Sequence, residues 1–421
     1  MRYVGVLATA WLIVACTAQP GSSVGEDPTP SARLLAGEPM VACMIKGEYP
    51  VQAQAPALCG TLSVPEDRSN PEGRQIGLRV AVVPAVATIH QPDPLFVVAG
   101  GPGDAATQFF AWLPTVFKEV HATHDIVLID QRGTGDSNPL TWPEMSDTSR
   151  LPEAKADALL SAWARDALAS TDADPRFYTT TVAADDLDAV RAALGYETIN
   201  LYGTSYGGTL AQYYLRQHGQ RVRVAVLDGS TPVDVPVFEW IAAHSQAALD
   251  LLFQRCAYDP ACREAFPRLA DEWAALMDRL ATPLTIVDPE SGEKAIIDHI
   301  KLAEAIHTSL LTESAAAQIP LGIHLAHKSQ WTEAAKIIGA PPSGGPTFVM
   351  ADEIFCSEAW ARFNSTEVAR HGAGSYALPR ELALARGARR HVRVPPSGRR
   401  AGRRRGGGPH RYPGAVVGGG R

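Results

Sequence analysis

The chain has 421 residues, of which 46% are hydrophobic and 20% are charged, and its formal net charge is -7. This length and composition are sufficient for one large domain, or for a domain with an insertion. They are typical of a globular protein and exclude a predominantly disordered chain.

The first residues have the form of an export signal. An apolar stretch from Tyr3 to Ala15 follows Arg2 and is too short to span a bilayer. Its end, a small residue before Cys16, resembles the bacterial lipobox, in which the cysteine is lipidated. We therefore predict a signal peptide over residues 1–16 and an exported bacterial lipoprotein, attached to the membrane through Cys16. Ordinary cleavage that removes Cys16, giving a periplasmic or secreted protein, is the alternative.

The other five cysteines favour a structural role. Residues 17–40 are rich in Pro, Ser, Gly and Ala, as expected of a flexible tether. Beyond it, the spacing favours the disulfides Cys43–Cys59 and Cys256–Cys262, because an exported protein sits where disulfides can form. Cys356 has no obvious partner. Neither pair has further ligands at zinc spacing, so we predict no metal and no cofactor.

Three segments in the first third of the chain have strand patterns. The alternation from Ile76 to Val82 predicts a half-buried strand in an antiparallel region. The runs Leu95–Ala99 and Ile126–Ile129 are nearly all apolar, as is typical of strands covered on both faces in a parallel sheet.

Strands and helices then alternate. The apolar positions between Thr181 and Gly195 keep helical spacing, with Thr181 as N-cap and Gly195 beyond the end. A strand from Ile199 to Tyr202, a helix beginning near Thr209 and a strand from Val222 to Leu227 follow. This order predicts an α/β fold with a mostly parallel sheet flanked by helices.

The most informative motif lies at one of these strand ends. Residues 203–207 read Gly-Thr-Ser-Tyr-Gly, a G-x-S-x-G pattern with a strand before it and a helix after it. Such a turn strains the backbone and leaves no room for side chains at its glycines, so the serine hydroxyl points out of the sheet. We predict that Ser205 is a catalytic nucleophile.

Two further loops follow predicted strands. Gly100-Gly-Pro-Gly follows the strand at Leu95, where a backbone N–H can face a developing oxyanion, and we choose Gly101 as the donor. The amide of Tyr206, directly after the nucleophile, is the second predicted donor. In the loop from residue 130 to residue 137, Arg132 and Asp136 are predicted to hold loops in place beneath the site.

Taken together, these motifs resemble the proline iminopeptidase and tripeptidyl aminopeptidase branch of the α/β-hydrolases. The resemblance covers roughly residues 43–385 and depends on five segments in order: Cys59-Gly-Thr-Leu-Ser-Val-Pro, Gly100-Gly-Pro-Gly, Asp130-Gln-Arg-Gly-Thr-Gly-Asp-Ser, Gly203-Thr-Ser-Tyr-Gly-Gly and Asp228-Gly. It implies an α/β-hydrolase fold and a peptidase that removes residues from free peptide N-termini. It also suggests that Glu358, in a Cys-x-Glu segment, meets the substrate amine. Ala99 departs from the family, which usually has histidine there.

We divide the chain accordingly. Residues 41–234 are expected to form the hydrolase core, 235–370 a helical lid insertion, 371–385 the remnant of the return to the core, and 386–421 a disordered tail. A helical packing layer without a role in substrate selection is the alternative to a lid.

The tail explains why the catalytic base stays unknown. Residues 386–421 contain 11 Arg and 10 Gly with no acidic residue, whereas the remainder carries a net charge of -18. A triad of this fold needs an acid and then a histidine after the serine. Asp352 is the last aspartate, and His371, His391 and His410 lack a preceding strand. Asp228 is kept as a candidate acid.

We therefore predict that the C-terminal strands are missing because the end of the chain is out of frame or otherwise replaced. Arg, Gly, Pro and Ala dominate when GC-rich DNA is read in the wrong frame. The expected function is a serine peptidase-like hydrolase, inactive if the triad is absent; the partners are a peptide or small acyl substrate. An esterase and a non-catalytic peptide-binding lipoprotein remain as alternatives, and nucleic-acid binding by the tail is rejected.

Overall fold

The computed structural model describes residues 33–47, 53–140, 171–287, 294–338 and 348–383, with Gly292 and single residues between 155 and 170. The strands are β1 Leu34–Leu35, β2 Glu38–Pro39, β3 Val41–Gly47, β4 Ala53–Pro65, β5 Gln75–Val83, β6 Leu95–Val98, β7 Ile126–Ile129, β8 Ile199–Thr204, β9 Val222–Asp228, β10 Leu284–Val287 and β11 Lys294–Ile297.

The helices are α1 Ala106–Trp112, α2 Lys118–His121, α4 Thr180–Ala193, α5 Tyr206–His218, α6 Ile241–Tyr258, α7 Pro260–Ala265, α8 Leu269–Arg279, α9 His299–Ser309, α10 Glu313–Ala316, α11 Ile319–His327, α12 Trp331–Ile338, α13 Phe348–Ile354 and α14 Ser365–His371. The short helical turns are η1 Pro175–Phe177, η2 Gly219–Arg221, η3 Phe355–Ala359 and η4 Trp360–Arg362, of which η3 is a π turn.

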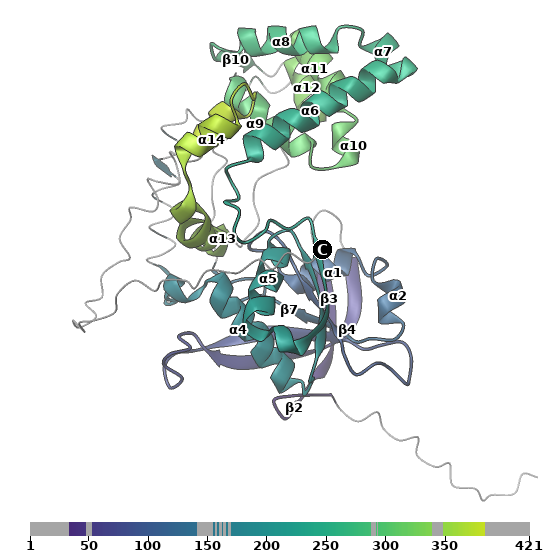
Figure 1. Ribbon diagram of the computed structural model, residues 1–421, viewed down its shortest axis with the longest axis vertical. Helices are drawn as coiled ribbons and strands as arrows, with labels where there is room; N and C mark the ends of the chain where they lie inside the picture. The colour runs from purple at the N-terminus through teal and green to yellow at the C-terminus, as the bar shows by residue number, and fades with distance from the viewer. Residues whose placement is uncertain are drawn as a thin grey trace, which may run out of the picture.

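A seven-stranded sheet in the order β3-β4-β5-β7-β6-β8-β9 forms the lower part of the molecule (Figure 1). The first four strands pair antiparallel, and β7, β6, β8 and β9 run parallel. All residues of β6 and β7 are buried, as predicted for strands covered on both faces. The four strands that the sequence predicts to be parallel are therefore neighbours.

Helices cover both faces of this sheet. Successive strand residues point to opposite faces, so Val127 joins the cluster that includes Leu187 of α4 and Leu210 of α5, whereas Leu128 joins the cluster that includes Phe110 of α1. The resulting three layers place the carboxyl ends of the parallel strands, and the loops that follow them, at one edge of the sheet.

Two helix starts differ from the prediction. Helix α4 begins at Thr180 and its N-cap is Thr179, not Thr181, because Thr179 has extended backbone and accepts a hydrogen bond from the Val182 amide. Helix α5 begins at Tyr206, three residues before the predicted start, since it continues directly from the turn at Ser205.

The predicted tether extends too far toward the domain. Residues 34–39 form the antiparallel hairpin β1–β2, and Leu35 and Met40 are buried in the core cluster of the sheet. The domain therefore begins before residue 40, because these apolar side chains cover the face on which α4 packs. Residues 1–32 lie outside the described residues.

The upper part is mainly helical and has its own core. Buried residues of α6, α8, α9, α11 and α12 form a separate cluster, and these helices stand above the sheet in Figure 1. The hairpin β10–β11 was not predicted. None of the helices in the described residues is long and apolar enough to cross a membrane.

The segment α13–η4 connects the two parts. Met350 and Ile354 of α13 are buried in the sheet's core cluster rather than in the helical one. By contrast, the predicted return to the core over residues 371–385 is wrong as far as residue 383. Tyr376 packs in the helical cluster and Ser375 donates a hydrogen bond to the Ala242 carbonyl of α6, so this segment stays with the helices. Residues 384–421 are outside the described part of the chain.

Candidate active site

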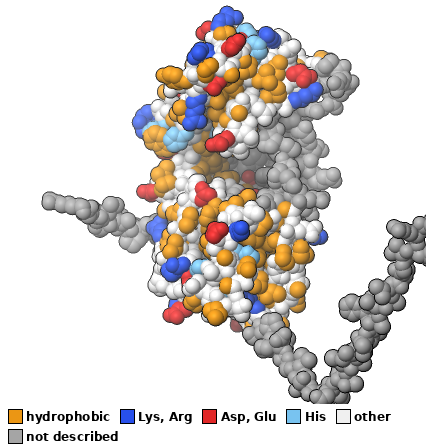
Figure 2. Space-filling model, turned by 90° about the vertical axis from the view of Figure 1, so that its right-hand side faces the viewer, with side chains coloured by type: hydrophobic (Ala, Val, Ile, Leu, Met, Phe, Trp, Pro, Cys, Tyr) orange, Lys and Arg blue, Asp and Glu red, His pale blue; other side chains and the backbone are white. Residues whose placement is uncertain are grey.

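Ser205 stands on the predicted turn between β8 and α5. Its backbone has φ 52° and ψ -123°, a conformation that residues with side chains rarely adopt, and its side chain is exposed. Figure 2 shows that the molecule is hollowed between the sheet part and the helical part. The strain turns the hydroxyl away from the sheet, as a nucleophile at this position requires.

The glycines around Ser205 are required by close contacts. A Cβ atom on Gly203 would lie 2.3 Å from the Gly207 carbonyl oxygen, and one on Gly207 would lie 2.3 Å from the Val98 carbonyl oxygen. A Cβ on Gly208 would lie equally close, at 2.3 Å, to the Ser230 side chain. Strand β6, strand β8 and helix α5 therefore meet at this turn with backbone in contact with backbone.

The glycine loop after β6 lies against the nucleophile. A Cβ on Gly100 would be 3.1 Å from the Ser205 Cβ and 3.7 Å from its Oγ, so this backbone passes directly beside the hydroxyl. Gly101 has φ 99° and is followed by a cis peptide bond to Pro102. The structure thus brings Gly101, the predicted oxyanion donor, into the loop next to Ser205.

Tyr206, whose amide is the second predicted donor, is the first residue of α5. A first-turn amide has no partner within its helix, which leaves it for an oxyanion. The Tyr206 side chain is buried, and its hydroxyl bonds to Gln131 Nε2 at 3.1 Å and Thr180 Oγ1 at 2.8 Å. Burial and then the charge of Glu358 raise the pKa of this phenol, so it stays protonated.

Asp228, the candidate acid, lies at the end of β9 beside the elbow, which is the turn between β8 and α5 that carries Ser205. Its carbonyl accepts the Ser205 amide at 2.8 Å, and its exposed carboxylate accepts the Tyr202 hydroxyl at 2.5 Å. Within the described part of the chain, no histidine bonds to this carboxylate.

Glu358, predicted to meet the substrate amine, contacts the first turn of α4. Its carboxylate accepts hydrogen bonds from the Thr180 amide at 2.7 Å and from the Thr180 hydroxyl at 2.6 Å. Each oxygen already has a donor, so an incoming ammonium would share the carboxylate with the first turn of α4. The sequence does not reveal this contact, because the partners are 178 residues apart.

The loop after β7 is held by Arg132 and Asp130. Arg132 is buried and forms a two-point ion pair with Asp186 of α4, at 2.6 and 2.7 Å. The exposed carboxylate of Asp136 lies 3.9 Å from Arg79 Nε of β5, and the Asp136 amide donates to Asp130. Asp130, which sequence reasoning missed, also accepts from the Thr107 amide and hydroxyl and so ties this loop to α1, just after the glycine loop.

None of the described histidines makes a hydrogen bond to Ser205. His371 lies over the Trp240 ring, with 3.6 Å between ring centroids, and close to Glu367 of its own helix. His218, His307 and His324 pair with Asp185, Ser245 and Glu272 respectively. The later candidates at positions 391 and 410 lie outside the described residues, so the catalytic base stays unassigned.

The cysteines form the pairs that their spacing favours. Cys43 is bonded to Cys59 and Cys256 to Cys262, while Cys356 has a free thiol. Among the residues that the structure describes, no group of three or more His, Cys, Asp or Glu side chains is placed to hold a metal ion.

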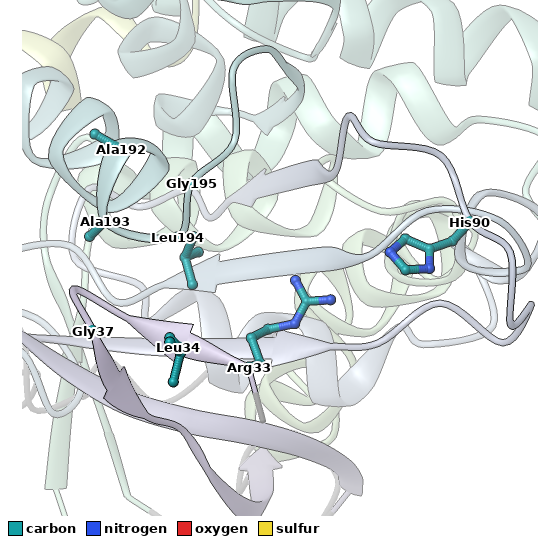
Figure 3. Close-up of a pocket in the computed structure, with 8 residues that line it drawn as sticks. All are labelled: Arg33, Leu34, Gly37, His90, Ala192, Ala193, Leu194 and Gly195. Carbon is teal, nitrogen blue, oxygen red and sulfur yellow. The ribbon is translucent and has the colours of Figure 1, made fainter. Parts of the chain in front are cut away.

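The structure also contains an open pocket of about 550 Å³ (Figure 3). It is lined by Arg33, Leu34, Gly37, His90, Ala192, Ala193, Leu194 and Gly195. Ala192, Ala193, Leu194 and Gly195 lie shortly before the start of β8, whereas Ser205 follows the end of that strand, so the pocket is not part of the candidate active site.

Comparison with known proteins gives three kinds of match. The α/β hydrolase fold family matches residues 93–295. Serine protease Hip1 of Mycobacterium tuberculosis is 31% identical over 259 residues, which are 56% of this chain and 47% of that protein. The tripeptidyl aminopeptidase of Streptomyces coelicolor is 30% identical over 188 residues, 41% of this chain and 35% of that protein.

Among solved structures, the proline iminopeptidase of Mycobacterium smegmatis is 15% identical, with 79% of this chain and 99% of that chain covered and a TM-score of 0.31. The chain spans about half the length of Hip1 and about a third of the tripeptidyl aminopeptidase.

Proposed function

We propose that this chain, which carries an α/β-hydrolase domain and belongs to the α/β-hydrolase superfamily, is a serine peptidase-like hydrolase that cleaves residues or short peptides from peptide N-termini. The observation that carries the proposal is the exposed, strained Ser205 with the Gly100–Gly101 loop beside it. The relatives' names, a serine protease and an aminopeptidase, support peptides as the substrate class.

The chemistry follows from this arrangement. The Ser205 oxygen attacks the scissile carbonyl, the carbonyl oxygen becomes an oxyanion, and the Gly101 and Tyr206 amides donate to it. Collapse breaks the C–N bond, a proton passes to the leaving amine, and water then hydrolyses the acyl-enzyme. A base must take the serine proton. Without one, oxyanion donors and binding typically retain only a residual acceleration of about 10³ to 10⁴ over water.

A fluorophosphonate probe tests the nucleophile. We expect covalent labelling of Ser205, identified by peptide mass spectrometry, and no labelling of Ser205→Ala. Absence of labelling would contradict the proposal that Ser205 is activated. It would favour the alternative of a non-catalytic peptide-binding lipoprotein. For a labelled chain, turnover of short aminoacyl and tripeptidyl amides supports the peptidase, whereas turnover of small acyl esters alone would make it an esterase.

The proposed location is the outer face of a bacterial membrane, with a lipid on Cys16. The apolar stretch before Cys16 supports this proposal. When the full chain is expressed in a bacterium, we expect the protein in the membrane fraction and Cys16→Ser in the soluble fraction. Equal distribution of the two proteins would contradict a lipid anchor.

A further inference from the structure

Four polar side chains form a continuous hydrogen-bonded path from the α13–η4 segment to Tyr206, the neighbour of the nucleophile, and on to Gln131. Gln131 Nε2 donates to the Tyr206 hydroxyl at 3.1 Å, and that hydroxyl lies 2.8 Å from Thr180 Oγ1. Thr180 donates from its hydroxyl and its amide to the two oxygens of Glu358, at 2.6 and 2.7 Å. The path joins η3, α4, the elbow and the loop after β7.

The hydrogen bonds of this path can all be donated in the same direction, from Gln131 towards Glu358. A carboxylate only accepts, so the single Thr180 hydroxyl proton goes to Glu358 and Thr180 Oγ1 is left as an acceptor. The Tyr206 hydroxyl therefore donates to Thr180 and accepts from the Gln131 amide group. Every member of the path is satisfied, and hydrogen bonds that point the same way polarise and strengthen one another.

The path is sheltered and ends on a charge. Thr180, Tyr206 and Gln131 are buried. The Thr180 amide belongs to the first turn of α4, where the positive end of the helix favours an anion such as the Glu358 carboxylate. Moving Glu358 away would leave the Thr180 amide and the Thr180 hydroxyl proton without their acceptors, which opposes separation of the α13–η4 segment from α4.

We propose that Glu358 is a positioning residue that latches the α13–η4 segment to α4 and, through Thr180 and Tyr206, fixes the elbow that carries Ser205 and the Tyr206 amide. The consequence for catalysis rests on the proposed function, whereas the latch itself does not. Its role differs from binding the substrate amine, because its partners belong to the protein's own core.

The chain contains a native reporter of this contact. Cys356 lies two residues before Glu358 in η3, and its thiol is free and partly buried. Burial, and then the charges of Asp352 and Glu353, raise the pKa of this thiol to about 12, so it reacts slowly while the segment is docked. Release of the segment exposes it.

The test measures two rates in the absence of substrate: modification of Cys356 by a maleimide, quantified by peptide mass spectrometry, and hydrogen exchange of the peptide that contains Tyr206. Losing charge-assisted hydrogen bonds predicts that Glu358→Ala speeds both rates roughly tenfold to a hundredfold. The matched control is Glu367→Ala, since Glu367 is in α14 and pairs with Arg370 and His371 of its own helix.

Three further variants test single hydrogen bonds of the path. Thr180→Val, which keeps the amide but loses the hydroxyl, should speed both rates, and Thr180→Ser should restore them. Tyr206→Phe should speed exchange at the elbow while Cys356 stays slow. If circular dichroism shows that Glu358→Ala does not fold, these variants are compared with the unmodified protein in its place.

Equal rates for Glu358→Ala and Glu367→Ala would overturn the latch, as would additive effects of Glu358→Ala and Thr180→Val in the double variant. Neither rate requires the protein to turn over a substrate. A negative result for the latch can therefore be distinguished from a negative result for the proposed function, in which Ser205 fails to react with the fluorophosphonate.

Discussion

At Ser205 the backbone turns with φ 52°, and the glycines on either side have carbonyl oxygens 2.3 Å from the places where their Cβ atoms would be. The strand–helix junction is therefore closed by contacts between backbone atoms. Any added methyl group must displace β6, β8 or α5, and with them the hydroxyl of the nucleophile.

We expect Gly207→Ala to lower the free energy of unfolding by about 1–3 kcal/mol, the usual cost of overpacking, because its Cβ would meet the Val98 and Ala99 carbonyl oxygens at the end of β6. The control is Gly219→Ala. Gly219 follows the same helix, has φ -57° and has no atom within 4 Å of its Cβ position. Urea unfolding that gives the same midpoint for both variants would contradict this account.

The α13 helix brings carboxylates close to the sheet domain. Its Glu353 is partly buried, and Asp174, before η1, and Glu358 carry charges of the same sign nearby. Burial and then these two charges raise the pKa of Glu353 to about 7 from 4.5. The helix is consequently docked on the core at some electrostatic cost, which Met350 and Ile354 offset by burying apolar area.

This raised pKa predicts how stability depends on pH. The folded protein binds the Glu353 proton more tightly than the unfolded chain does, so the free energy of unfolding falls as pH rises from 4.5 to about 7. Glu353→Gln should lose less stability than the unmodified protein between about pH 5 and about pH 8 in urea unfolding. The control, Glu333→Gln, changes an exposed carboxylate. A pH dependence of Glu353→Gln equal to that of the unmodified protein would refute the prediction.

Among the described residues, strand β9 carries several exposed apolar side chains at one edge of the sheet. This strand is last in the sheet order, and Val224, Val226 and Leu227 are 45%, 47% and 41% exposed. An apolar edge strand with unpaired backbone groups is a template for pairing with another chain. The described part of the protein should therefore self-associate through this edge.

We expect Val226→Lys to reduce self-association several-fold, since a charge on an edge strand opposes strand pairing. Leu251→Lys is the control, because Leu251 is similarly exposed, at 47%, but lies on helix α6. Light scattering over a concentration series measures the effect. If Leu251→Lys reduces association as strongly as Val226→Lys, the contact is not specific to β9.

Much of the sheet domain follows from local sequence patterns. Apolar runs predict β6 and β7, and the G-x-S-x-G pentapeptide predicts the elbow, because each depends on residues a few positions apart. The N-cap of α4 was misplaced by two residues, because Thr179 and Thr181 are both of a residue type that caps helices. The hairpin β10–β11 and the docking of residues 372–383 on the upper helices were missed. This docking depends on which of the two apolar cores the segment packs against.

The strained junction at Ser205 can be read from the residues alone, since glycines at positions 203 and 207 are the residues that such a turn accepts. The surroundings of Ser205 depend on how distant segments pack. Glu358 reaches Thr180 across 178 residues, and none of the described histidines reaches Ser205. Contacts between distant segments arise from the packing of two separate apolar cores. Local sequence patterns do not show which side chains this packing brings together.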